Sequence, residues 1–197
     1  MLDDTTNLVS LLKDPTLLVT KGYLAGDWVD GEGGAVFDVL NPARGDVIAQ
    51  VSDFSRAQAK KAIKAAEKAQ KDWAAVTAKE RSVILRRWFD LMIENADDLA
   101  IILTAEQGKP LPEAKGEISY GASFIEFFAE EAKRIYGETI PGHQRDKRIA
   151  VLKQPIGVAA SITPWNFPNA MITRKAGPAL AAGCAFVARP ARETPLS

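Results

Sequence analysis

Apolar and polar residues follow two different patterns along this chain. Between residues 18 and 54 they alternate over short segments separated by turn residues, which is typical of small strands, and Ala25-Gly26-Asp27 has the composition of a hairpin turn. From residue 55 to residue 136 the apolar residues recur every three or four positions, which predicts helices. After residue 155, two short apolar runs at 156–161 and 184–188 flank a helical pattern over 169–182. This last pattern predicts a strand, a crossover helix and a second, parallel strand.

The helical part contains signals for the ends of its helices. Ser55 is a candidate N-cap, and Thr77-Ala78-Lys79-Glu80 has the spacing of a capping box. Asn95 is expected to cap a third helix, which stops at Gly108. Six apolar residues at helical spacing are expected to face the core: Val83, Ile84, Leu85, Trp88, Leu91 and Met92.

Three further segments complete the pattern. Residues 1–17 are expected to form an arm, docked or loose, with a short helix that Pro15 ends. A long helix is predicted over residues 113–136, with Gly137 as its end. The polar sequence after Pro141-Gly142 predicts a surface loop and then a strand, whose exposed edge would need a partner or protection.

The turn after the strand at 156–161 carries the main candidate for chemistry. Its sequence, Ile162-Thr163-Pro164-Trp165-Asn166-Phe167-Pro168, follows the carboxyl end of a parallel strand, where open α/β sheets bind ligands. Pro168 suits a first helical turn because its missing N–H would be unpaired there. The amide of Asn166, between two prolines, is a neutral donor that can stabilise an oxyanion. We expect this side chain to point into a site and not outward to solvent.

Composition excludes several classes of protein. The 197 residues are 47% hydrophobic, and 25 basic residues balance 25 acidic ones. This balance gives no reason to expect nucleic acid or an anionic membrane as a partner, and no apolar run reaches the roughly 18 residues that span a bilayer. The start lacks the features of a secretory signal, and the single cysteine and single histidine form neither a disulfide framework nor a metal cluster. We interpret the protein as cytoplasmic.

The turn sequence resembles the oxyanion-hole signature of the aldehyde dehydrogenase superfamily. Four further segments resemble the succinate-semialdehyde dehydrogenases in particular: residues 107–111, 129–137, 152–158 and 171–175. The resemblance runs from about Leu18 to Ser197 and covers less than half of a full family member. It implies an α/β fold with an incomplete Rossmann-type parallel sheet, preceded by a small β segment and a helical region. The implied divisions after the arm are 18–138 for the strands and helices, 139–155 for an oligomerisation-arm strand, and 156–197 for the first strand–helix–strand unit.

The resemblance also implies a nicotinamide cofactor and the residues that contact it. These are Ile162, Thr163, Pro164, Trp165, Arg189, Ala191 and Arg192. NAD-using members often have Glu at the position of Arg192, where it accepts from the ribose hydroxyls, whereas a cation favours a 2′-phosphate. NADP is therefore favoured over NAD. Glu193 next door weakens this argument, and Arg192 is equally interpretable as an exposed loop arginine.

Three residues are candidates for binding the substrate. Arg174 lies eight residues after Asn166, about two helical turns along, and can hold a carboxylate through two parallel hydrogen bonds. The alternative is a surface arginine. Tyr120 belongs to an aromatic stripe that the family places beside the substrate tunnel, although such stripes are more often core. Phe167 is the third candidate, on the turn itself.

The implied reaction is the NAD(P)-dependent oxidation of succinate semialdehyde to succinate through a cysteine thioester, with Asn166 holding the oxyanion. Cys184 lies in an apolar strand, which is the setting of a buried structural thiol. The resemblance places the nucleophile and the general base beyond Ser197, so this chain alone is expected to be inactive. The alternatives are a dehydrogenase for another carboxylated aldehyde, and a non-catalytic fragment that binds nucleotide or pairs with a full-length subunit. Self-association is implied for the complete enzyme, and no metal is implied.

Overall fold

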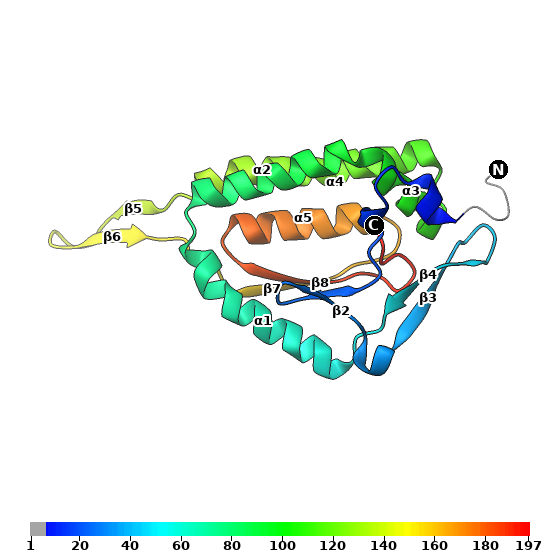
Figure 1. Cartoon of the computed structure of the whole chain (residues 1–197). Coiled ribbons are helices and arrows are strands. Elements are labelled where there is room, and N and C mark those ends of the chain that lie inside the picture. Colours follow the sequence, from blue (N-terminus) through cyan, green and yellow to red (C-terminus); the bar gives the residue numbers. More distant parts are fainter. Residues whose placement is uncertain (1–6) are drawn as a thin grey trace.

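The computed structural model describes residues 7–197, and its centre is a parallel pair of strands between helices (Figure 1). Strands β7 (Val158–Ile162) and β8 (Ala185–Arg189) pair in parallel, and helix α5 (Pro168–Ala181) connects them. Helix α5 lies against one side of this pair, while α1 (Arg56–Ala75) lies on the other. The strand–helix–strand prediction is confirmed, with Pro168 at the first position of α5 and Gly183 in the left-handed region after it.

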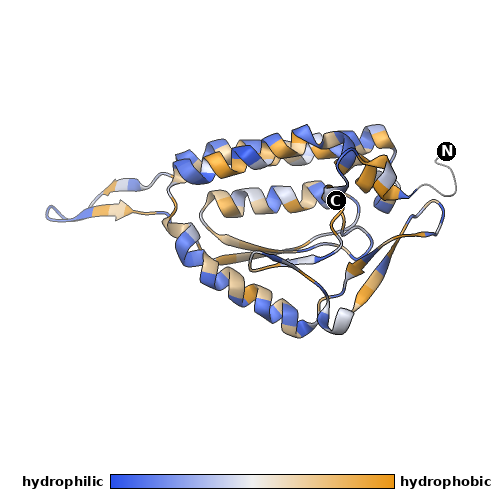
Figure 2. Ribbon diagram, in the orientation of Figure 1, coloured by the Kyte–Doolittle hydropathy of each residue, from blue (hydrophilic) through white to orange (hydrophobic). Residues whose placement is uncertain are grey.

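Helices α2 (Ala78–Glu94) and α4 (Leu111–Glu131) form an outer layer over α5, and α3 (Ala96–Gln107) connects them. The core between these helices is made of apolar side chains. Its buried members are Leu85, Met92, Ala122, Ile125, Ala129, Ala132 and Ala181. Figure 2 shows that apolar and polar segments alternate along these helices. Within residues 7–197, no helix combines the length and the apolar character that crossing a bilayer requires.

Four short strands precede the helices. Strands β1 (Gly22–Leu24) and β2 (Asp27–Val29) form an antiparallel hairpin, and β3 (Val36–Leu40) pairs antiparallel with β4 (Val47–Ser52). The hairpin turn at Ala25-Gly26 has positive φ at both residues, 55° and 103°, as a two-residue hairpin turn with matching twist requires. The predicted hairpin is therefore confirmed.

The predicted helix starts depend on local hydrogen bonds, and two of the three are confirmed. Ser55 and Gln58 form a capping box at α1, and Thr77 and Glu80 form one at α2. Asn95 precedes α3, but its side chain does not cap that helix: its amide donates to the Leu91 carbonyl at the end of α2. The prediction for Asn95 is wrong in this respect, because the side chain donates backward to the Leu91 carbonyl one turn earlier, which also accepts the Asn95 N–H at 3.1 Å.

Only part of the predicted core stripe on α2 faces the core. Leu85 and Met92 are buried and Trp88 packs against them, whereas Val83, Ile84 and Leu91 are exposed. Positions 85, 88 and 92 lie three and four residues apart and share the face toward α4 and α5. The other three side chains are left exposed by the neighbouring elements, so treating all six as core was wrong.

The helix predicted over residues 113–136 ends earlier. Helix α4 stops at Glu131, and a 3-10 turn at Ala132–Arg134 follows. Gly137 is not its cap: a Cβ at Gly137 would lie 2.3 Å from the Val151 carbonyl oxygen, so this glycine belongs to the hairpin that follows. That hairpin pairs β5 (Glu138–Pro141) with β6 (Arg148–Val151) and projects from the body (Figure 1). The sequence analysis missed β5.

The arm is docked. It contains two 3-10 turns, Leu8–Leu11 and Pro15–Leu17, so Pro15 begins a turn and the prediction that it ends a helix was wrong. The buried carboxylate of Asp98, at the start of α3, accepts from the N–H groups of Lys13 at 3.1 Å and Asp14 at 2.8 Å. A helix residue thus holds the extended segment between the two turns.

Candidate active site

The turns that follow β7 and β8 leave the sheet at the same edge. Ile162 and Arg189 are partners in the parallel register, and the N–H of Thr163 donates to the Arg189 carbonyl at 3.1 Å. The segments that carry the expected cofactor contacts, 162–165 and 189–192, therefore lie side by side. The edge is also open, because Ile162 is 74% exposed. Within residues 7–197 no further strand pairs with β7 or β8.

The turn between β7 and α5 presents Asn166 at this edge. Pro164, Trp165, Asn166 and Phe167 are all exposed, whereas Pro168 is buried at the start of α5. The expectation that Asn166 faces into an enclosed site is not met within residues 7–197, since they leave it open to solvent. Its backbone is nevertheless held, because its carbonyl accepts a hydrogen bond from Lys109 Nζ at 3.1 Å.

Lys109 and Glu117 form an ion pair that contacts the Asn166 turn. Glu117 lies on α4 with its side chain fully buried, and its Oε2 accepts from Lys109 Nζ at 2.6 Å. Its Oε1 accepts from two successive N–H groups at the start of α5, those of Asn169 at 3.1 Å and Ala170 at 3.3 Å. Lys109 Nζ also lies 3.8 Å from the centroid of the Phe167 ring. One buried ion pair thus contacts both the turn and the helix that follows it.

Sequence reasoning missed both members of this pair. Lys109 entered only as part of the matching segment 107–111, and Glu117 was not singled out within the helix predicted over residues 113–136. A signal was present in Gly108, which is the left-handed C-cap of α3 with φ 82°. This cap ends α3, and Lys109 follows it at a position beside the Asn166 turn. The partner of Lys109 comes from a different helix, so sequence spacing does not identify it.

Two of the three candidate substrate residues, Tyr120 on α4 and Arg174 on α5, are connected through Phe124. The rings of Tyr120 and Phe124 meet edge to face with centroids 4.7 Å apart. The guanidinium of Arg174 lies 5.5 Å from the Phe124 centroid, and its Nη1 is 3.9 Å from Met171 Sδ. Arg174 and Tyr120 are both exposed, so neither belongs to the core. No ion pair of Arg174 is found within residues 7–197, which leaves its charge available to an anion.

The residues of the second turn suit a nucleotide. Arg189 and Arg192 supply cations for phosphate groups, and exposed Ile162 and Trp165, from the first turn, supply apolar surface for a ring. Arg192 is already engaged: its Nη1 lies 3.5 Å from Asp53 and its guanidinium 4.3 Å from the Phe37 ring. Its side chain stays 61% exposed, so it remains accessible to a phosphate. The donor set therefore fits a dinucleotide at this edge.

The partly buried side chain of Gln70 anchors the start of β8 from α1. The amide of Gln70, on α1, donates to the Gly183 carbonyl at 2.9 Å and accepts from the Ala185 N–H. Cys184, between these two contacts, is a free thiol and is 4% exposed. This burial confirms the structural interpretation of Cys184 and excludes it as an accessible nucleophile.

A second buried carboxylate holds the segment that follows β8. Glu106, near the end of α3, accepts from the N–H groups of Leu196 at 2.8 Å and Ser197 at 2.9 Å. Burial raises the pKa of Glu106 to about 7, and these hydrogen bonds only partly oppose the shift. Glu106 and Glu117 therefore play the same part for the two segments that leave the sheet.

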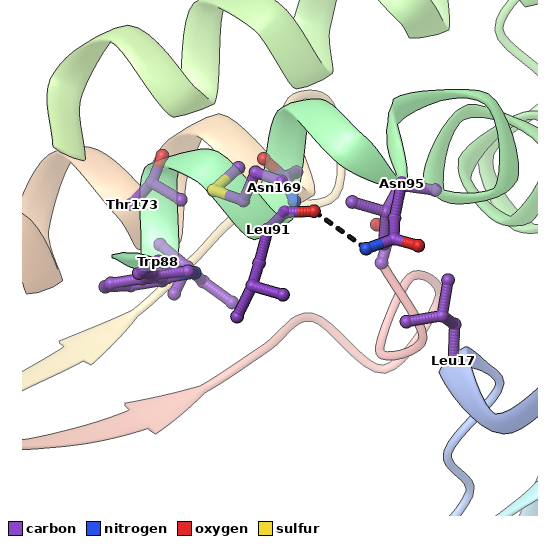
Figure 3. Close-up of a pocket in the computed structure, with 10 residues that line it drawn as sticks. Leu17, Trp88, Leu91, Asn95, Asn169 and Thr173 are labelled. Carbon is purple, nitrogen blue, oxygen red and sulfur yellow. Dashed lines mark hydrogen bonds between the residues drawn. The ribbon is translucent and has the colours of Figure 1, made fainter. Parts of the chain in front are cut away.

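A cavity of about 320 Å³ lies between α2, α5 and the N-terminal arm (Figure 3). Trp88, Leu91 and Asn95 line it from α2 and its C-terminal cap, and Asn169 and Thr173 line it from α5. Figure 3 shows the Asn95 amide turned back toward the Leu91 carbonyl. None of the predicted site residues lines this cavity, so it is separate from the Asn166 edge.

Comparison with known proteins now identifies the family. The model of the aldehyde dehydrogenase family matches residues 28–197. This chain belongs to the aldehyde dehydrogenase family. It is 64% identical over 186 residues to the glutarate-semialdehyde dehydrogenase of Pseudomonas putida and 61% identical over 186 residues to the NADP(+) succinate-semialdehyde dehydrogenase GabD of Escherichia coli. The crystal structure of succinate-semialdehyde dehydrogenase from Burkholderia pseudomallei matches with a TM-score of 0.92 at 57% identity.

The matched region is one part of a longer aldehyde dehydrogenase. Each of the two relatives aligns with 94% of this chain but only 39% of its own length, and the Burkholderia structure aligns with 94% of this chain and 38% of its own. The chain therefore spans about two-fifths of these family members. The superfamily resemblance and the aldehyde dehydrogenase-like α/β fold are both confirmed.

Proposed function

We propose that this chain is the N-terminal part of an enzyme that oxidises succinate semialdehyde to succinate with NAD(P), through a cysteine thioester. The observation that carries the proposal is the Asn166 turn at the carboxyl end of β7, beside the Arg189 turn at the end of β8. This arrangement puts an amide donor next to a nucleotide-compatible edge in a member of the aldehyde dehydrogenase family.

The proposed role of Asn166 is to donate from its side-chain amide to the oxygen that becomes negative when a thiolate adds to the aldehyde. A donor fixed before the reaction stabilises this charge without reorganising, and losing one such donor costs about 2.7–4 kcal/mol of barrier. We place the thiolate and the general base outside these 197 residues, because the chain's single cysteine, Cys184, is buried.

For the cofactor we propose NADP in preference to NAD. The bound nicotinamide would accept the hydride. Arg192 supports the preference, since an accessible guanidinium can bind a 2′-phosphate that NAD lacks, and the Escherichia coli relative is named for NADP(+). Ile162, Thr163, Pro164 and Trp165 would contact the cofactor from the first turn, and Arg189 and Ala191 from the second.

Arg174 is the proposed partner of the substrate carboxylate, with Tyr120 and Phe167 as apolar neighbours. Its charge is exposed and has only soft neighbours, Phe124 and Met171, so a carboxylate would be its first strong partner within the described chain. A second candidate substrate is glutarate semialdehyde, because the Pseudomonas putida relative is named for it. It carries the same terminal carboxylate.

The test uses a chimera in which this chain is joined after Ser197 to the remaining sequence of the Escherichia coli relative. NADP and NAD reduction is followed with succinate semialdehyde, glutarate semialdehyde and an uncharged aldehyde of similar length. Arg174→Ala should raise KM for the two carboxylated substrates much more than for the uncharged one. Lys175→Ala, which removes the adjacent exposed cation on α5, is the matched control and should change neither. Equal effects of Arg174→Ala on charged and uncharged aldehydes would refute the assignment.

In the same chimera, Asn166→Ala should lower kcat by about a hundredfold or more, with the fold intact by thermal unfolding. A change in kcat of less than threefold would exclude the oxyanion role. The chain of 197 residues is assayed in parallel. Activity of this chain alone would contradict the placement of the nucleophile, and co-elution with a full-length subunit on gel filtration would favour the non-catalytic alternative.

A further inference from the structure

We propose that Lys109, in the connection between α3 and α4, and Glu117, on α4, are positioning residues that fix the Asn166 turn. The inference rests on the proposed function, since the turn matters only if Asn166 acts on a substrate. Neither residue would contact substrate or cofactor. Their effect would pass through the backbone of residues 166–170.

Glu117 connects the turn to the start of α5. One carboxylate oxygen accepts the N–H groups of Asn169 and Ala170, which are otherwise unpaired donors at a helix start. The carboxylate also lies at the positive end of the helix dipole, which favours its charge. Within residues 7–197 the structure places no side-chain cap on α5, so Glu117 takes that role from another helix.

Lys109 connects Glu117 directly to the backbone of Asn166. Its ammonium group has three donors, of which one is directed to Glu117 Oε2 at 2.6 Å and another to the Asn166 carbonyl at 3.1 Å. The same group lies over the Phe167 ring at 3.8 Å. A single charge therefore contacts two successive residues of the turn.

The burial of this pair separates it from an ordinary surface ion pair. The side chains of Lys109 and Glu117 are 10% and 0% exposed. The pair of Lys115 with Asp97 is almost as short, 2.7 Å, but its side chains are 49% and 51% exposed. Water screens an exposed pair, so it restricts its surroundings little, whereas a buried pair keeps its geometry or leaves an uncompensated charge. This contrast supplies a matched control.

We expect the Lys109–Glu117 pair to affect kcat more than KM. Asn166 stabilises charge that develops only during the reaction, so a displaced turn lowers kcat more than it raises KM. A misplacement of about 1 Å in a catalytic group can cost about a hundredfold. Lys109→Met keeps an unbranched apolar side chain and removes the charge.

The first measurement is amide hydrogen exchange on the 197-residue chain. Lys109→Met should raise the exchange rate at Asn169 and Ala170 by about tenfold or more relative to the parent, while Lys115→Met should leave it unchanged. This arm needs no activity, so it is independent of the proposed function. Exchange at these two amides that is the same in both variants would overturn the proposal.

The second measurement is a double-mutant cycle in the chimera described above. Lys109→Met should lower kcat by about ten- to a hundredfold with KM changed less than about threefold. In the Asn166→Ala background the same substitution should change kcat by less than about twofold, because its effect passes through Asn166. Equal losses in both backgrounds would show a general structural role and overturn the proposal.

A second variant covers the case in which Lys109→Met unfolds. Glu117→Gln keeps an oxygen for the Asn169 and Ala170 N–H groups but turns an NH₂ group toward Lys109, so it should show the same kcat loss and the same dependence on Asn166. A chimera with no dehydrogenase activity in the parent form refutes the proposed function instead. The exchange result then still decides whether Lys109 holds the turn.

Discussion

Gly121 lies where the start of α5 approaches α4, and its replacement tests how tightly these helices are packed. A Cβ at this position would lie 2.4 Å from Asn169 Oδ1, 3.1 Å from Thr173 Oγ1 and 3.4 Å from Ala170 Cα. We predict that Gly121→Ala lowers the free energy of unfolding, although alanine is the better helix former. Gly116 on the same helix is the matched control, because a Cβ there would meet no atom within 4 Å.

The expected magnitude is the difference between two opposing effects. Alanine in place of glycine inside a helix contributes about 1 kcal/mol, and Gly116→Ala should show this gain in full. Forcing a methyl group into a packed contact costs about 1–3 kcal/mol, and this cost applies to Gly121→Ala but not to Gly116→Ala. The two variants should therefore differ by about 1–3 kcal/mol. For a domain of this size each kcal/mol shifts Tm by about 2–4 °C, so a gap of several degrees is expected.

Thermal and urea unfolding of the parent chain and the two variants measures this gap. The nearest obstacle is Asn169 Oδ1, which finds no hydrogen-bond partner within residues 7–197, so Asn169→Ala should relieve part of the penalty of Gly121→Ala. Equal stabilisation by Gly116→Ala and Gly121→Ala would refute the reasoning. It would mean that α5 can move away from α4 without a cost in stability. The Asn166 turn would then not be held in a fixed position relative to α4.

Two further predictions concern buried charged groups. Burial raises the pKa of Glu106 from 4.5 to about 7, so the folded chain binds this proton more tightly than the unfolded chain. The contribution of Glu106 to the free energy of unfolding is therefore complete below pH 4.5. It falls by about 3 kcal/mol as the pH rises through 7. Glu106→Gln should flatten urea-unfolding free energies across this interval, and an unchanged slope would contradict the assignment. Arg81 donates to the Ala181 carbonyl at 3.0 Å and to the Val76 carbonyl, at the ends of α5 and α1. Arg81→Met should cost about 2–4 kcal/mol because one buried and one partly buried carbonyl lose their donor. Arg87→Met, at an exposed pair, should cost less than about 1 kcal/mol by the same melts. Similar losses would show that the Arg81 contacts do not stabilise the helix ends.

Features that depend on neighbouring residues could be predicted from the sequence. The capping boxes at Ser55 and Thr77 and the stop at Gly108 each use atoms within one helical turn. The same holds for the Ala25-Gly26 turn and for Pro168 at the start of α5. Where two helix ends compete for one side chain, as at Asn95, the local pattern did not decide between them.

Features that depend on distant segments could not be predicted in this way. The spacing on α2 does not show that Val83 and Leu91 face solvent, because the direction of α4 and α5 sets the buried face. Strand β5 was missed because its residues are exposed and it exists through pairing with β6. The exposure of Asn166 likewise depends on what surrounds the edge and not on its own turn.

The sequence by itself determined the family, the strand–helix–strand unit and the turn that carries Asn166. Each of these depends on contiguous residues whose local conformations are restricted by their own side chains. Only the tertiary structure decided what holds that turn. Three buried carboxylates on α3 and α4, those of Asp98, Glu106 and Glu117, each accept two successive N–H groups from a segment more than fifty residues away along the chain. A buried backbone donor must find an acceptor, and folding alone brings these acceptors to their donors.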